Sequence, residues 1–188
     1  MTVEEVFSQV GQHMIEGLMV HSQMADYYAF LGFQGFQKKH EYHYFEESWN
    51  YKKLSDYYMT HYHKILLDRP FQNPNIIPDG WVNHTQMDVS LETKKASVQS
   101  GFEKWIDWEK QTKILYQQMY RELISLGEVA GAIELSVYIE DVSKELAAAE
   151  QEHLNYLAME YSMTDITLEQ QSMAKKYCKK IREVLQDA

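Results

Sequence analysis

The chain has 188 residues, of which 45% are hydrophobic and only eight are Gly and three Pro, so disordered and collagen-like classes are excluded. A single cysteine excludes a disulfide scaffold and a Cys-cluster metal site. Eighteen basic and 28 acidic residues give a formal net charge of −10, which argues against general nucleic-acid binding and is compatible with a cation as ligand. No apolar run is long enough to span a membrane and no signal peptide is visible, so we expect a cytoplasmic protein that binds neither membrane nor nucleic acid.

The first part of the chain predicts two long helices joined by a tight turn. Thr2 and Glu5 have the spacing of a capping box, which opens the first helix. Apolar residues then recur every three or four positions, as on the buried face of a helix. Gly32 and Gly35 bracket the expected turn, and the same periodicity predicts a second helix at about 36–68.

The rest of the chain predicts an irregular segment followed by three more helices. All three prolines lie in one stretch, and because proline disrupts helix interiors we expect an irregular connection at 69–90. The third helix follows it and ends before Gly127, which suits the left-handed position that closes a helix. A fourth helix is expected at about 129–162, and a weaker capping box at Thr167 opens a last helix at 167–186.

Four helices of about 30 residues each span roughly 45 Å and bury their apolar faces most simply side by side. Short turns make the helices of each pair antiparallel, while the irregular segment is long enough to run the length of the bundle. We therefore expect a single all-α domain over residues 1–188, with a four-helix core at 3–162 and the last helix added to it. One long crossover is typical of the ferritin-like topology among four-helix bundles.

Two acidic residues fall on faces that should be buried, Glu47 in the second helix and Glu109 in the third. An ionised carboxylate without a partner there would cost several kcal/mol. Protonation, a bound cation or an error in helical phase would each resolve the conflict. A bound metal also accounts for histidines at the same depth, because bundle cores build metal sites from facing carboxylates and imidazoles. His40 and His43 share the face of Glu47, and His21 should lie opposite them.

Ordinary structural roles stay open for several of these residues. A buried His21 is more often a hydrogen-bonded core residue than a metal ligand. Glu150 and His153 have the Glu-x-x-His spacing, but a chain with 28 acidic residues and eight histidines is expected to show such a match by chance. His61 and His63 lie near a helix end and are expected at the surface.

Three segments match a known family in order along the chain. Residues 24–36 have a Met, an aromatic pair and a Gly-Phe turn, and residues 45–47 end in two Glu. Residues 108–112 read Trp-Glu-Lys-Gln-Thr, and residues 138–145 form an acidic stretch. Over roughly residues 10–155 these segments resemble the first hairpin, the third helix and the fourth helix of the ferritin family.

The resemblance implies a ferroxidase site of carboxylates and imidazoles. It places Glu47 at the bridging position of the second helix, Glu109 at the ligand of the third and Glu145 at the ligand of the fourth. The family's first-helix Glu and second-helix His fall on Met14 and Asn50. Because a thioether is a poor ligand for iron, the ordinary two-iron site looks depleted. His21 and His43 then become candidates for a site displaced toward the first turn.

The first hypothesis is a ferritin-like protein that binds or stores iron, or Mn or Zn in its place, and oxidises Fe(II) with oxygen. Its predicted metal ligands are Glu47, Glu109, Glu145, His43 and His21. A second hypothesis is a relative that keeps the fold, has no metal and acts as a structural or interaction protein. A third is a di-metal redox enzyme with an organic substrate, which would need an open pocket beside the metals.

Self-association is also expected. Aromatic residues crowd one end of the first hairpin: Tyr27, Tyr28, Phe30, Phe33 and Phe36. They offer more apolar surface than one helix face can bury, and the resemblance implies pairing through this hairpin. The sequence therefore predicts a homo-oligomer, at least a dimer.

Overall fold

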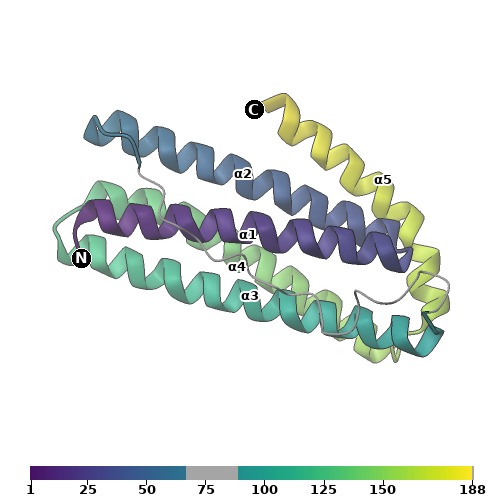
Figure 1. Ribbon diagram of the computed structural model, residues 1–188. Helices are drawn as coiled ribbons and strands as arrows, with labels where there is room; N and C mark the ends of the chain where they lie inside the picture. The colour runs from purple at the N-terminus through teal and green to yellow at the C-terminus, as the bar shows by residue number, and fades with distance from the viewer. Residues whose placement is uncertain (67–88, 188) are drawn as a thin grey trace.

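In the computed structural model the described residues, 1–66 and 89–187, form five α-helices and no strand (Figure 1). The helices are α1 (Val3–Leu31), α2 (Gln34–Tyr62), α3 (Leu91–Ser125), α4 (Val129–Ala158) and α5 (Met163–Asp187). The first four pack side by side as a bundle, in which α1 contacts both α2 and α3, and α3 contacts α4. Helix α5 turns back from the end of α4 and packs along α2.

The helix order confirms a ferritin-like four-helix bundle with an added C-terminal helix. Helices α1 and α2 are antiparallel, as are α3 and α4 (Figure 1). Because α2 ends at one end of the bundle and α3 begins at the other, the connection between them joins opposite ends. The crossover is predicted at 69–90. Its residues 69–88 lie outside the described part of the chain, and only its last two residues are described. Among the described helices, none combines the length and apolar character needed to cross a membrane.

The predicted start of α1 and both glycine helix ends are confirmed. The Glu5 backbone N–H donates to Thr2 Oγ1 at 3.2 Å, and the Thr2 N–H donates to Glu5 Oε2 at 2.8 Å. Gly32 ends α1 with φ 84°, and Gly127 follows α3 with φ 77°, a conformation that favours glycine. Gly35 was expected in the first turn but lies inside α2.

Two helices end earlier than predicted because residues other than glycine take the left-handed conformation. Helix α2 stops at Tyr62 instead of position 68, since His63 has φ 55°. Helix α4 stops at Ala158 instead of position 162, because Glu160 and Tyr161 both have φ 50°. Glu160 and Tyr161 give no sign of this in the sequence, because among residues other than glycine it is Asn, Asp and His that are enriched in this region.

The start of α5 was also predicted wrongly. The helix begins at Met163, where the Ser162 hydroxyl accepts from the Asp165 N–H at 3.4 Å. Thr167 does not cap the helix. It lies one turn inside, and its hydroxyl donates to the Met163 carbonyl at 2.6 Å.

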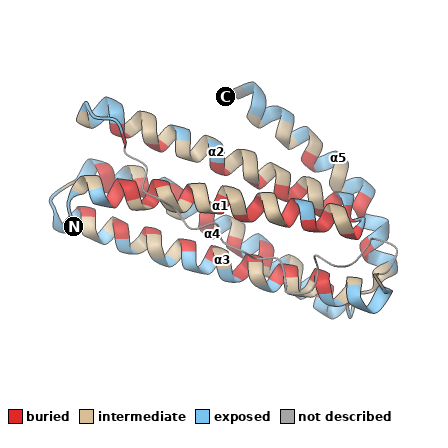
Figure 2. Ribbon diagram, viewed as in Figure 1, coloured by how far each residue is buried: buried red, intermediate tan, exposed pale blue. Residues whose placement is uncertain are grey.

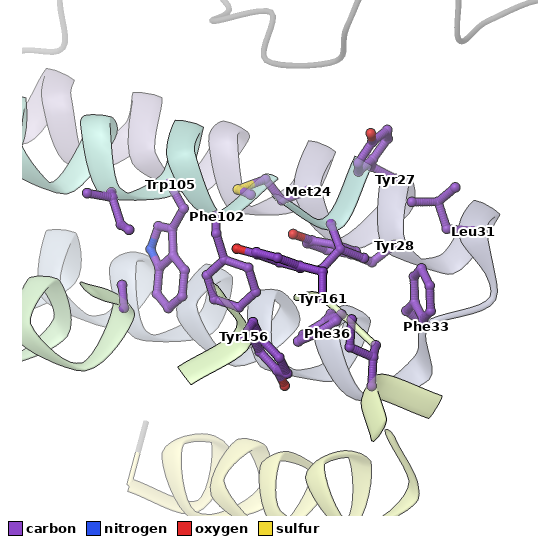
Figure 3. Packing of buried hydrophobic residues seen from close by; sticks show 14 of the residues in the cluster. Met24, Tyr27, Tyr28, Leu31, Phe33, Phe36, Phe102, Trp105, Tyr156 and Tyr161 are labelled. Carbon is purple, nitrogen blue, oxygen red and sulfur yellow. The ribbon is translucent and has the colours of Figure 1, made fainter. Parts of the chain in front are cut away.

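The apolar core is divided into two clusters, one at each end of the bundle, and buried residues line the inward faces of all four helices (Figure 2). The cluster at the α1–α2 turn is rich in aromatic rings (Figure 3) and includes Met24, Tyr28, Phe36, Phe102, Trp105, Tyr156 and Tyr161. The cluster at the other end includes Val6, Phe7, Val10, Met14, Leu54, Tyr116, Leu123 and Tyr138.

The expectation that the hairpin aromatics leave surplus apolar surface is wrong. Tyr27, Tyr28, Phe33 and Phe36 are at most 7% exposed, and Phe30 packs partly buried against the same cluster. Helix α5, which the sequence left unplaced, packs on α2 close to this end. The aromatic hairpin end is therefore core of the protomer itself.

Candidate metal centre

A layer of polar side chains separates the two apolar clusters. All four bundle helices contribute to it at or next to the boundary between the clusters. We call it the polar layer; its members are His21 of α1, His40, His43, Glu46 and Glu47 of α2, Glu109 of α3 and Glu145 of α4. A buried layer with this much charge needs counter-charges or bound cations to be stable.

The tightest group in the polar layer is His43 with Glu46 and Glu145. His43 Nδ1 lies 3.4 Å from Glu46 Oε2 and 3.5 Å from Glu145 Oε1. One ligand atom from each of the three lies within 4.8 Å of the others. The structure thus brings His43 and Glu145, two of the predicted ligands, to one point between α2 and α4.

Glu46 belongs to this group although it was not predicted as a ligand. Its Oε1 accepts a hydrogen bond from the Tyr42 hydroxyl at 2.7 Å, which fixes the carboxylate beside His43. Its side chain is 30% exposed, because its position lies at the edge of the buried face of α2. The signal that could have found it is the i,i+3 spacing from His43, which places the two residues on neighbouring positions of one helix face.

Glu109 and His21 form a second group beside the first. The Trp105 indole N–H donates to Glu109 Oε1 at 2.9 Å, and His21 Nε2 lies 3.7 Å from the same oxygen. The other oxygen, Oε2, is buried and has no hydrogen-bond partner within the described part of the chain. With Glu109 only 1% exposed, either a proton or a cation would satisfy that oxygen.

Stacked imidazoles join the two groups. His21 Nδ1 lies 3.1 Å from His40 Nδ1, so one ring donates to the other. The ring of His21 also lies over that of His43, with centroids 5.1 Å apart. His21 is therefore a hydrogen-bonded core histidine, which is the more common role of a buried histidine. It also faces the carboxylate of Glu109.

Glu47 lies deep in the bundle against the backbone of α1. A Cβ atom placed on Gly17 would be 3.4 Å from Glu47 Oε1, so this carboxylate fits where α1 carries no side chain. Glu47 is 8% exposed, and among the described residues no Lys or Arg forms an ion pair with it or with Glu109. The prediction that both acids are drawn into the interior is confirmed, and neither is neutralised there by a basic side chain.

The two positions that depart from the ferritin pattern have ordinary surroundings. Met14 is 1% exposed and belongs to the apolar cluster at the N-terminal end of α1. Asn50 is only partly buried. The polar layer therefore lies toward the α1–α2 turn from Met14.

Burial makes ionisation of the acids costly. It raises the pKa of Glu109 to about 7 and also raises the pKa of Glu145. The pKa of Glu47 lies well above its usual range because of burial and because other carboxylates of the layer are close. These shifts describe the layer without a cation, and a bound cation would reverse them.

The histidines respond to their surroundings in opposite ways. Burial lowers the pKa of His21 to about 3 and the pKa of His40 well below its usual range, so both are neutral. Burial also lowers the pKa of His43, but the carboxylates of Glu145 and Glu46 outweigh it and raise that pKa to about 10. Without a metal, a protonated His43 is the main positive charge facing the acids of this group.

The donor set fits a divalent transition metal. Protein ligands bind such ions at about 2.0–2.2 Å, so two ligand atoms of one ion lie up to about 4.4 Å apart. The His43 contacts already meet this limit, and small side-chain movements would bring all three groups within it. One imidazole with two carboxylates suits iron, manganese or zinc.

The Glu-x-x-His pair of α4 is not part of the layer. Glu150 is 45% exposed and pairs with Lys110 at 3.1 Å. His153 Nδ1 lies 2.5 Å from the Tyr161 hydroxyl. His61 and His63 are exposed, as expected for residues at the end of α2.

Comparison with known proteins supports the fold and is silent on the chemistry. No family model matches the chain, and no curated protein matches it either. Among solved structures, the chain is similar to a ferritin from Archaeoglobus fulgidus that was engineered into a closed form by site-directed mutagenesis. The TM-score is 0.76 at 13% sequence identity, over 92% of this chain and 94% of that one. The chain therefore has the ferritin-like fold.

Proposed function

We propose that this protein binds iron in the polar layer, with manganese or zinc as substitutes, and oxidises Fe(II) with oxygen as part of iron storage. The observation that carries the proposal is the convergence of four carboxylates from three helices with no Lys or Arg ion pair to Glu47 or Glu109 in the described part of the chain. The similarity to a ferritin structure is consistent with it.

The residues would divide the work by position. His43, Glu46 and Glu145 would hold one ion, because their ligand atoms are already close together. Glu109, with one oxygen unpartnered, and Glu47, deep in the layer, would hold a second ion or bridge the two. Oxidation would then consume two Fe(II) ions, each giving one electron to the same oxygen molecule, which takes up two protons and leaves as hydrogen peroxide; the protein would supply position and charge.

A metal-free role in structure or interaction is the alternative, and one observation favours it. Protonated His43 forms ion pairs with both Glu46 and Glu145, so part of the charge of this group is balanced without an ion, although His43 Nδ1 and Glu46 Oε2 make no hydrogen bond within the described part of the chain. Met14 and Asn50 at two ligand positions of the family point the same way. In this alternative the unpartnered oxygen of Glu109 would carry a proton, which agrees with a pKa raised to about 7.

Metal analysis separates the two functions. The purified chain is loaded with Fe(II) without oxygen, passed through a desalting column and analysed for iron. We expect at least one ion per chain in the wild type and a clear loss in His43→Ala/Glu145→Gln. On admitting oxygen, absorbance from Fe(III) should rise faster with the wild type than with Glu47→Gln.

Glu150→Gln is the matched control, because it removes an acid of α4 outside the layer. It should bind as much iron as the wild type. Iron content well below one ion per chain in the wild type, or equal content in the wild type and the layer variant, would contradict the proposal and favour the metal-free role.

A further inference from the structure

A pocket opens beside the polar layer, between α2, α4 and α5. Its volume is about 260 Å³, and its floor includes His43, Glu46 and Glu145. Helix α5 supplies the opposite wall with Lys176, Tyr177 and Lys180. The pocket is open to the outside of the bundle, so the candidate metal ligands that line it are reachable from there. Helix α5, which contributes to its lining, packs back along α2 (Figure 1).

Two of the four lysines that line this pocket have acidic partners. Lys39 forms an ion pair with Glu152, and its ammonium lies 4.2 Å from the centroid of the Trp105 ring. Lys144 pairs with Glu140 at 2.8 Å.

The other two lysines lie over tyrosine rings instead. Lys180 Nζ is 4.6 Å from the centroid of the Tyr42 ring, and Lys176 Nζ is 5.2 Å from that of Tyr177. Neither ammonium has a carboxylate partner among residues 1–66 and 89–187. Tyr42 links this wall to the floor, since its hydroxyl donates to Glu46.

The acids of the pocket offset the charge of these two ammonium groups only in part, because each acid also pairs with another basic side chain. Glu152 pairs with Lys39, and both Glu46 and Glu145 contact His43. A divalent ion bound by the floor residues would add positive charge a short distance away. Cation entry through this mouth is disfavoured, and an anion is the complementary ligand.

We propose that a small oxyanion, a carboxylate or a phosphate, binds in this pocket between the two lysines and the metal. Lys176 and Lys180 hold the anion through charge-assisted hydrogen bonds, in the same pocket as His43, Glu46 and Glu145, which would hold the ion. The ligand is small, because pockets for drug-sized molecules usually start at about 300 Å³. This inference rests on the proposed metal site.

Metal and anion should strengthen each other's binding. The metal adds charge of the sign that attracts the anion, and linkage requires the anion to raise metal affinity by the same factor. In the metal-free protein the carboxylates of the floor offset part of the lysine charge. Anion binding is therefore weaker there than in the metal-loaded protein.

The test uses Mn(II) as the metal, and inorganic phosphate and succinate as the probes. Bound Mn(II) is counted by the loss of its free EPR signal, and the anion is followed by broadening of its ³¹P or ¹³C resonance at constant ionic strength. The pocket variant is Lys176→Ala/Lys180→Ala. The matched control is Lys175→Ala/Lys179→Ala, which removes the same charge from α5 outside the pocket.

Saturable broadening is expected in the wild type and in the control. The pocket variant should still bind Mn(II) but hold the anion roughly tenfold more weakly or worse. Saturation by phosphate alone, or by succinate alone, identifies the class of oxyanion.

Equal anion binding by the pocket variant and the wild type would overturn the inference, as would broadening that does not saturate in either. If Mn(II) fails to bind at all, the metal site is refuted instead. Calorimetric titration of the metal-free chain with both anions then tests anion binding by the two lysines separately. Weaker anion binding by the pocket variant than by its control supports the lysine site, and equal binding by the two variants refutes it.

Discussion

At the scale of single residues, Glu109 shows the cost of the polar layer most directly. It is almost fully buried, it has one oxygen without a partner, and burial raises its pKa from an ordinary 4.5 to about 7. An acid with a raised pKa binds its proton more tightly in the folded chain than in the unfolded chain. Its effect is that stability falls as the pH rises from about 4.5 through 7.

Glu109→Gln should remove this penalty and weaken metal binding at the same time. The amide oxygen can still accept from the Trp105 indole N–H, so the fold is expected to stay intact. Above pH 7 the metal-free variant should be more stable than the wild type by up to roughly 3 kcal/mol, with a flatter dependence between pH 4.5 and 7. Urea unfolding across this range, together with iron content, measures both effects.

Glu150→Gln serves as the reference for that comparison, because its acid is half exposed at the surface and paired with Lys110. Its pH dependence should follow the wild type. A Glu109→Gln chain that unfolds without any change in metal content would show that Glu109 is a structural partner and not a ligand.

His43 should report metal binding through a released proton. Its pKa near 10 means that it is protonated at pH 8 in the metal-free chain, and a metal ligand must be neutral. At that pH we expect about one proton to leave for each ion bound by His43, Glu46 and Glu145. Calorimetry in buffers of different ionisation enthalpy counts these protons.

In His43→Gln the proton release should disappear together with most of the affinity. His61→Gln is the control, since that ring is exposed at the end of α2. Full affinity in His43→Gln, or binding without proton release in the wild type, is incompatible with His43 as a ligand.

The residues found from sequence are those at the centre of a helix face. Glu109 lies on the same face of α3 as the buried Trp105 and Tyr116, so its depth could be predicted from periodicity alone. Glu46 was not predicted as a ligand, because its position lies at the edge of the buried face of α2, where the exposure of a side chain depends on how α4 and α5 pack. Its partner Glu145 comes from another helix, and sequence spacing carries no information on such distances.

At the scale of elements, α5 is the helix whose placement the sequence left open. Gln170 explains part of its docking, because its side-chain Oε1 accepts from the backbone N–H groups of Gly35 at 2.8 Å and Phe36 at 3.2 Å. It thus caps the start of α2, where the N-cap residue Phe33 makes no side-chain hydrogen bond. The contact joins residues far apart in sequence, and periodicity could not reveal it.

Gln170→Ala should destabilise the chain by about 1–3 kcal/mol, because it leaves two buried N–H groups at the start of α2 without an acceptor. Gln171→Ala is the control, because Gln171 is the next residue of the same helix and its side chain is exposed. Chemical denaturation of both variants measures the difference, and equal midpoints would mean that Gln170 adds nothing to the docking of α5.

For the molecule as a whole, the four bundle helices, their order and their antiparallel pairing followed from Gly32, Gly127 and one group of prolines, because long amphipathic helices have few ways to pack. The helix ends were less predictable, because His63, Glu160 and Tyr161 adopt the left-handed conformation that glycine most readily adopts. The division of the core into two apolar clusters became visible only once the four helices were aligned in space.

Because the hairpin aromatics are buried within the protomer, self-association would have to use another surface. On α4, Val129, Ile133 and Val137 are 56%, 64% and 49% exposed, and their spacing of four residues places them on one side of the helix. Near the same end, Ile124 of α3 is 45% exposed. Single exposed apolar residues are common on protein surfaces, but several on one face favour contact between copies of the chain.

We therefore expect the chain to form a dimer or a larger homo-oligomer at tens of micromolar, with α4 in the contact. Ile133→Lys should shift it toward the monomer, because a charge in the centre of an apolar contact is costly to bury. Leu168→Lys is the control, because Leu168 is 73% exposed on α5, away from this strip. Light scattering of the three proteins decides: a monomeric wild type would refute self-association, and an Ile133→Lys chain as large as the wild type would place the contact elsewhere.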